Sequence, residues 1–173
     1  MFKRIVVPLD GSELAERALA QAEELAHATG VPIRIVRVVD VGKLVTHSPL
    51  GFGVAPTALQ LALDDEERFS REYLERIVRE VTERGVDASS ELRYGVAERE
   101  IVDLTRPDDL IVMATHGRGG VSRWFMGSVA EEIARRSPVP VMLVRSIPAE
   151  MVEAREAAGA REARHVVTVP VGA

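Results

Sequence analysis

Five short β-type runs separated by helix-type segments are the feature that most constrains how this chain can fold. The runs are RIVVPLD (4–10), PIRIVRVVDV (32–41), ASSELRYG (88–95), DDLIVMAT (108–115) and VPVMLVR (139–145). Such alternation predicts a parallel sheet with helices on both faces. Right-handed crossovers leave few strand orders, and the order 3-2-1-4-5 puts the apolar first and fourth runs side by side in the middle. We therefore expect an α/β fold, a single doubly wound domain with a five-stranded parallel sheet in that order.

Helix signals fill the intervals between these runs. Ser12 is a plausible N-cap and Gly30 a plausible C-cap of the first helix. A long helix is expected over 57–84, with Phe69, Tyr73 and Ile77 on one face and the acidic run 64–67 in solvent near its start. Shorter helices are expected over 96–106 and 128–136, and a glycine- and proline-containing loop over 41–57. The third run is more polar than the others, which predicts an edge strand.

The predicted sheet ends near residue 146, and the remaining 147–173 form a C-terminal extension. That extension is a charged, helix-prone stretch followed by the β-prone HVVTVPV. A length of 173 residues suits one domain. The start MFKRIVVPLDG lacks the apolar region of a signal peptide, no apolar run is long enough to span a membrane, and cysteine is absent. We expect a cytoplasmic protein without membrane contact. A formal net charge of −5 argues against nucleic-acid binding.

In the order 3-2-1-4-5, ligands bind at the switch point between the first and fourth strands, beyond their carboxyl ends. Those ends carry PLDGS (8–12) and MATHGRGG (113–120). Nine residues separate Gly117 from Gly127, and Ser128 then opens a helix. Glycine lets backbone N–H groups at a helix start approach a phosphate, and a serine hydroxyl can donate to one. The competing explanation is that Ser128 and Glu131 form a capping box, which needs no ligand.

Two charged residues at the predicted switch point remain open to more than one interpretation. Asp10 can accept from an adenine amino group, a ribose hydroxyl or a metal-bound water, or it can serve only the Asp-Gly turn. Arg118 can contact phosphate, or it can be a solvated loop residue. The loop is neither a Walker motif, which needs a lysine, nor a Rossmann fingerprint. Asp108 and Asp109 lie at the opposite end of the sheet and point to opposite faces, so they make a poor acid–base pair.

Three separated segments together resemble the nucleotide-binding branch of the universal stress protein family. That branch carries G-x2-G-x9-G-[ST] after the fourth strand, which Ala114, Gly117, Gly127 and Ser128 match apart from alanine in the first place. IVVPLDGSELAERAL and SPVPVMLVR resemble the family's first strand with its helix and its last strand. The resemblance covers about residues 1–146.

The resemblance implies an adenine-nucleotide site and an assembly. It implies that ATP binds, with Mg²⁺ held mostly by phosphate and water. By resemblance, Asp10 and Val38 lie by the adenine and ribose, and Gly117, Gly127, Ser128 and the Val129 backbone lie by the phosphates. Pro8, Ala114 and Arg118 are further candidate binding residues. The methyl group of Ala114 could crowd the ribose or a phosphate. It also implies a homodimer, paired antiparallel through 140–144.

Three functions follow from these observations. The leading one is an ATP-binding stress-response regulatory module. The second is a dimeric stress or scaffold module that binds no nucleotide. The third is an enzyme, at most a slow ATP hydrolase, which the lack of a clear base, lysine or metal cluster near the loop disfavours.

Overall fold

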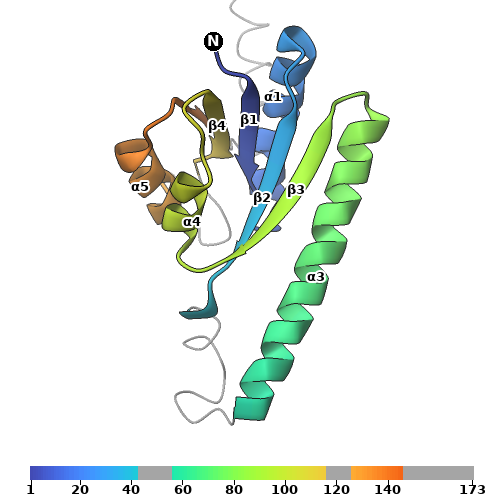
Figure 1. The fold of residues 1–173 in the computed structure, drawn as a ribbon, viewed down its shortest axis with the longest axis vertical. Coiled ribbons are helices and arrows are strands. Elements are labelled where there is room, and N and C mark those ends of the chain that lie inside the picture. Colours follow the sequence, from blue (N-terminus) through green and yellow to red (C-terminus); the bar gives the residue numbers. More distant parts are fainter. Residues whose placement is uncertain (43–55, 116–125, 146–173) are drawn as a thin grey trace, which may run out of the picture.

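The structure is a computed structural model that describes residues 1–42, 56–115 and 126–145. Its elements are β1 (Arg4–Pro8), α1 (Glu13–Thr29), β2 (Ile33–Val39), α3 (Pro56–Glu83), β3 (Ala88–Tyr94), α4 (Ala97–Asp103), β4 (Asp109–Ala114), α5 (Ser128–Arg136) and β5 (Val141–Val144). The strands form one parallel sheet in the order β3-β2-β1-β4-β5 (Figure 1). The predicted fold class and strand order are confirmed, and β3 is an edge strand as expected. The loop 43–55 and the extension 147–173 lie outside the described residues.

The central strands are buried on both faces because helices cover the sheet from both sides. Successive strand residues point to opposite faces. Ile5 and Val7 therefore pack in a cluster with α1 and α3, while Val6 between them packs in a second cluster with α4 and α5. All three are fully buried. This explains why β1 is a continuous apolar run instead of an alternating one.

Helix α1 begins and ends at the residues that its capping signals predict. The Ser12 hydroxyl accepts from the Ala15 N–H at 3.2 Å. Gly30 adopts φ 70°, a left-handed conformation that favours glycine, and its N–H donates to the Ala26 carbonyl. Small side chains line the face toward the sheet, so the helix axis can approach closely. These are Ala15, Ala18, Ala22 and Ala26.

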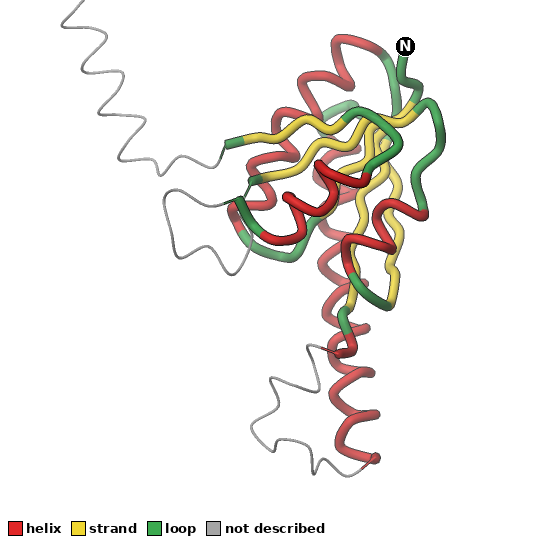
Figure 2. The backbone as a smooth tube through the Cα atoms, turned by 90° about the vertical axis from the view of Figure 1, so that its left-hand side faces the viewer, coloured by secondary structure: helices red, strands yellow, loops and turns green. Residues whose placement is uncertain are grey.

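Helix α3 is longer than the strands it covers, and only its C-terminal part packs on the sheet. Tyr73 and Ile77 are buried, whereas Phe69 on the same helix face is 51% exposed. Figure 2 shows that the helix extends beyond the sheet. The acidic run was expected in solvent, and this expectation is wrong for Glu66, whose carboxylate pairs with the buried Arg37. Within the described residues no helix is both long and apolar enough to cross a membrane.

Charged side chains join β1 and β4 at the edge where the strands begin. Arg4 donates to both carboxylate oxygens of Asp109, at 2.9 and 2.5 Å. The Arg106 N–H donates to the same carboxylate at 2.7 Å. Lys3 pairs with Asp108 at 3.1 Å in a far more exposed position. Both aspartates thus serve the amino-terminal edge of the sheet, away from the switch point.

Candidate functional site

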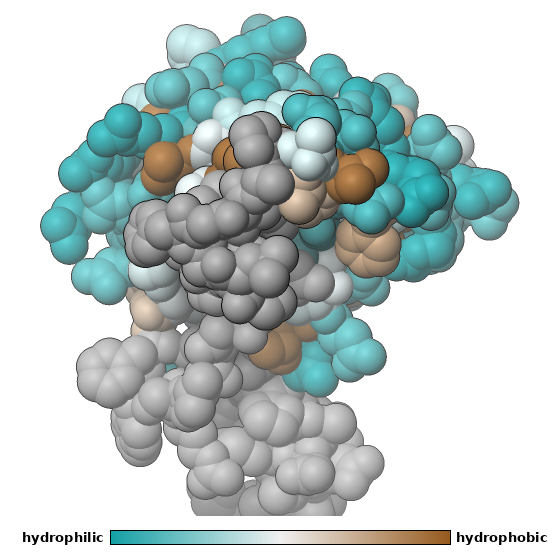
Figure 3. All heavy atoms as spheres, turned by 90° about the horizontal axis from the view of Figure 1, so that it is seen from below, coloured by the Kyte–Doolittle hydropathy of each residue, from teal (hydrophilic) through white to brown (hydrophobic). Residues whose placement is uncertain are grey.

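The switch point lies between the carboxyl ends of β1 and β4, where the direction in which strands are added to the sheet reverses. From β1 the sheet grows outward through β2 and β3, and the chain then returns to place β4 on the other side of β1. Because the strands are parallel, the carboxyl ends of β1 and β4 meet the same edge of the sheet. Figure 3 looks onto this edge, and the described surface around it is mainly hydrophilic with small hydrophobic areas.

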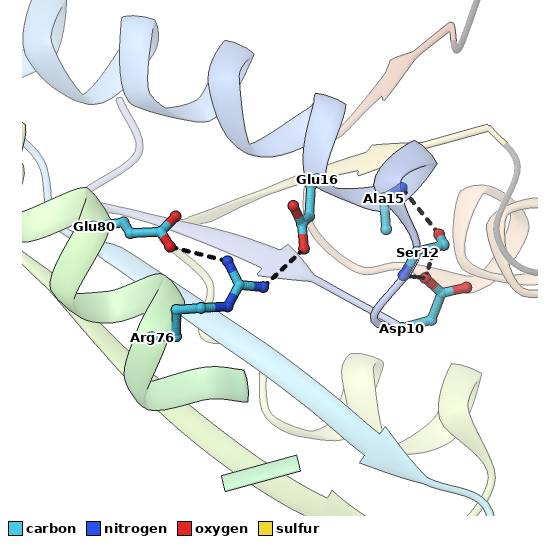
Figure 4. Close-up of polar contacts among 6 residues, drawn as sticks. All are labelled: Asp10, Ser12, Ala15, Glu16, Arg76 and Glu80. Carbon is cyan, nitrogen blue, oxygen red and sulfur yellow. Dashed lines mark hydrogen bonds and ion pairs between the residues drawn. The ribbon is translucent and has the colours of Figure 1, made fainter. Parts of the chain in front are cut away.

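The turn after β1 presents Asp10 at this edge. Pro8 ends the strand, and both Pro8 and Asp10 are half-buried. One carboxylate oxygen of Asp10 accepts from the Ser12 N–H at 3.0 Å and from the Ser12 hydroxyl at 2.6 Å (Figure 4). Gly11 between them has φ 82°, which a side chain would strain. Asp10 thus has the turn function that the sequence left open, and its carboxylate is held in one orientation.

The second wall of the site is the start of α5. The Gly127 N–H donates to the carbonyl of Thr115 at 2.7 Å. The chain that leaves β4 at Thr115 therefore returns to the same point twelve residues later, and α5 begins directly beyond the end of β4. This contact places the helix start at the switch point.

Gly127 is the N-cap of α5, and Ser128 is the first helical residue. The capping-box explanation of Ser128 is therefore wrong, because a capping box needs the serine at the N-cap position. No side chain of the described residues bonds to the first N–H groups of α5. Gly127 has φ −60° and ψ 144°, which any residue can adopt, so its backbone conformation does not require glycine.

The remaining predicted site residues lie on different faces of the sheet. Val38, in β2, and Val129, in α5, are half-buried and pack on the cluster covered by α4 and α5. Ala114 is buried at 7% exposure in the opposite cluster, with α1. Its methyl group thus fills the core under α1. Gly117 and Arg118 lie outside the described residues.

Sequence reasoning missed Arg37, a buried charge beside this site. Its side chain is 3% exposed in β2, and it faces α1 and α3, the opposite side from Val38. The available signal was an arginine inside the apolar run IRIVRVV. Tyr73 of α3 lies against the guanidinium, and burial, followed by the nearby Glu16 carboxylate, raises the pKa of Tyr73 well above its ordinary value. Tyr73 is therefore a neutral residue of the core cluster between the sheet and helices α1 and α3.

Metal-binding side chains do not gather here among the residues that the structure describes. Those ranges hold no group of three or more His, Asp or Glu residues placed to bind one ion.

These features define the class of protein: a doubly wound α/β protein with an aspartate turn after β1 and a helix start beyond β4 at the same edge of the sheet. The model of the universal stress protein family matches residues 1–145, and the chain belongs to that family.

One relative is similar to the chain in sequence, and two solved structures are similar to it in fold. A universal stress protein of Methanocaldococcus jannaschii is 31% identical over 147 residues, covering 84% of this chain and 83% of its own. The solved structure of universal stress protein UspA from Lactobacillus plantarum superposes with a TM-score of 0.71 at 24% identity, covering 83% of this chain and 98% of its own. The universal stress protein from Archaeoglobus fulgidus in complex with dAMP gives a TM-score of 0.52 at 21% identity, covering 83% and 97%.

Proposed function

We propose that this protein binds ATP in the crevice between the carboxyl ends of β1 and β4, as a regulatory member of its family. The observation that carries the proposal is the hydrogen bond from the Gly127 N–H to the Thr115 carbonyl. It places the start of α5, which no side chain of the described residues caps, at the same sheet edge as the Asp10 turn. A ligand that bridges the two walls needs a negative group at one end and hydrogen-bond donors at the other.

The α5 end suits phosphate. The first N–H groups of a helix have no partner within the helix and carry the positive end of its dipole. Ser128 is exposed at this start, so its hydroxyl is available to a phosphate oxygen. Since the backbone at Gly127 does not require glycine, the missing Cβ is best explained by close approach of a ligand. Gly117 and Arg118, from the loop between β4 and α5, are proposed to complete the phosphate site.

The β1 end suits the nucleoside. Asp10 is a fixed acceptor for an adenine amino group or a ribose hydroxyl, with Pro8 and Val38 as apolar neighbours at the same strand ends. The dAMP held by the relative from Archaeoglobus fulgidus is an adenine nucleotide, which supports this ligand class. Mg²⁺ would be held mainly by phosphate and water. Any hydrolysis of ATP would be slow, since the described part of the crevice shows no general base poised beside it.

A nucleotide-free dimeric module is the second candidate function, and two observations favour it. Asp10 already bonds within its own turn. β5 carries four half-buried apolar residues, and among the described residues it has a partner strand on one side only. We propose that β5 pairs antiparallel with β5 of a second copy through 140–144, an arrangement that closes an apolar edge. This dimer is compatible with either function.

The experiment that separates the two functions is direct. Mass spectrometry of nucleotide released from freshly purified protein, followed by calorimetric titration with ATP and Mg²⁺, should show an adenine nucleotide and saturable binding. Ser128→Ala should weaken ATP by about tenfold, the effect of one hydrogen bond to a charged group. Ser89→Ala, on the exposed edge strand β3, is the matched control and should bind as wild type. Titration without heat, together with released material free of nucleotide, would favour the second candidate.

A further inference from the structure

We propose that Arg37 is a positioning residue for the nucleotide site: its buried guanidinium fixes the Asp10–Ser12 turn and ties that turn to α3. The affinity part of this inference rests on the proposed function. The structural part does not, because it concerns contacts within the protein.

Arg37 is held by α3 on one side. Its Nε donates to the Ser70 hydroxyl at 2.7 Å, and its Nη2 pairs with Glu66 at 2.8 Å. The rings of Phe69 and Tyr73 flank the guanidinium, with centroids 5.5 and 5.4 Å from Cζ. A guanidinium between two aromatic rings and a carboxylate has little freedom to rotate.

The other side of the guanidinium meets the turn. A Cβ built on Gly11 would lie 2.6 Å from Arg37 Nη1, so this nitrogen packs directly against the backbone of Gly11. Nη1 is buried, and within the described residues it has no hydrogen-bond partner. Gly11 is therefore required twice, by its φ of 82° and by the guanidinium beneath it. A shift of the Asp10–Ser12 turn toward β2 would bring Gly11 into contact with Arg37. Arg37 could make room only by breaking its bonds to Ser70 and Glu66 in α3.

A second, weaker tie joins the same elements. Arg76 of α3 donates to Glu80 at 2.9 Å and reaches Glu16, in the first turn of α1, at 3.4 Å (Figure 4). The Arg76 side chain is 45% exposed, so water weakens this pair. Arg37, by contrast, is buried, and it contacts Gly11, the residue next to Asp10.

The charge at position 37 is costly, which argues that it does more than fill space. Removing a cation from water is unfavourable unless its donors are satisfied, and Nη1 is not. An apolar side chain of similar length would pack here without that cost. A guanidinium carries three nitrogens in one plane. Here Nε bonds Ser70, Nη2 bonds Glu66, and Nη1 packs against Gly11. Because Asp10 bonds the Ser12 N–H across Gly11, this packing fixes the direction of the Asp10 carboxylate.

The test uses the full-length chain and two arginines of the same strand. Arg37→Met keeps the apolar stem and removes the guanidinium. Arg34→Met is the matched control, since Arg34 lies on the other face of β2 and reaches the Ser90 carbonyl of β3. The readouts are the amide ¹H–¹⁵N resonances of residues 11–15 without nucleotide, and calorimetric titration with ATP. We expect Arg37→Met to shift these resonances and to weaken ATP about tenfold, because misplacing a binding group by ~1 Å costs up to 10²-fold. Arg34→Met should leave both unchanged.

Glu66→Gln supplies a milder variant in case Arg37→Met does not fold. It keeps Arg37 in place, weakens the ion pair, and should shift the same resonances by a smaller amount. Resonances of residues 11–15 that stay at their wild-type positions in the folded Arg37 or Glu66 variants would overturn the proposal. Shifted resonances together with wild-type ATP affinity would overturn the inference that Arg37 positions the nucleotide site. If wild-type protein does not bind ATP, the proposed function fails and the affinity part of the inference fails with it, while the resonances still decide whether Arg37 sets the turn.

Discussion

The two edges of the sheet use buried charge in opposite ways. At the amino-terminal edge, Asp109 accepts from Arg4 twice and from the Arg106 N–H once, and its side chain is completely buried. At the carboxyl-terminal edge, Arg37 is almost as buried, yet its Nη1 packs against Gly11 and has no hydrogen-bond partner among the described residues. Asp109 is paired on both carboxylate oxygens and serves the fold. Arg37 keeps one nitrogen without such a partner at the edge where parallel sheets bind their ligands.

Removing the amino-terminal pair should have the largest effect and should act on stability alone. Asp109→Ala leaves the Arg4 guanidinium, 13% exposed, without its carboxylate, and this should lower the free energy of unfolding by about 3–5 kcal/mol. Urea denaturation measures the change. Asp108→Ala, which breaks the exposed pair with Lys3, is the control and should cost less than about 1 kcal/mol. At urea concentrations too low to unfold either variant, both should bind ATP with wild-type affinity. A loss of affinity would show that the two edges of the sheet are coupled.

Substitutions at Gly127 should act on the ligand and spare the fold. Gly127→Val adds a branched side chain at the start of α5 and should weaken ATP by about 100-fold or more, about 2.7 kcal/mol. Gly127→Ala should fall between Val and wild type, because the loss grows with the volume added beyond Cα. Calorimetry gives the affinities, and far-ultraviolet circular dichroism should stay unchanged. Wild-type affinity in the valine variant would remove α5 from the phosphate site.

The β5 edge offers a test of the proposed dimer that leaves the sheet intact. The carbonyls of Pro140 and Val144 accept from β4, so the backbone groups of Leu143 point to the open side. Leu143→Pro removes an outward N–H without removing a β4 hydrogen bond, a substitution that edge strands tolerate. We expect the dimer to weaken by about tenfold or more, from lost hydrogen bonds at a two-fold interface. Light scattering across a dilution series measures this. An unchanged dimer would place the interface elsewhere.

The smallest expected effect is at Ala114, where this chain departs from its family's motif. Its methyl group packs in the core under α1, so removing it should not open space for the ligand. Ala114→Gly should leave ATP affinity within about threefold of wild type, well under the 1.4 kcal/mol of a tenfold change. It should lower the free energy of unfolding by about 0.5–1 kcal/mol, as glycine does inside a strand. A clear gain in affinity would mean that the methyl group crowds the ligand after all.

Much of the fold is predictable from the sequence because its signals are local and agree with one another. Ser12 and Gly30 mark the ends of α1, and the apolar runs around Val6 and Ile111 mark the strands that are buried on both faces. Strand order follows from these runs together with the handedness of crossovers. The helix predicted over 128–136 has the bounds of α5, Ser128–Arg136.

What the sequence does not reveal depends on contacts between distant segments. Ser128 with Glu131 has the spacing of a capping box, but the N-cap of α5 is Gly127 and Ser128 is already helical. The Gly127 N–H instead bonds to Thr115, a contact that the local sequence does not predict. Arg37 and Glu66 are 29 residues apart, and neither side chain predicts its partner. Phe69 keeps the helical spacing of the buried Tyr73 and Ile77, yet its side chain is 51% exposed.

The central position of β1 also sets an order for folding during synthesis. Ile5 pairs with Ile33 on one side and with Leu110 on the other. Closing the longer of these two loops costs about 1 kcal/mol more in chain entropy, and it requires that most of the domain has already been made. A nascent chain that has not reached residue 110 can assemble β1, β2 and β3 while one apolar edge of β1 stays open. The crevice is therefore completed only when β4 arrives and closes that edge.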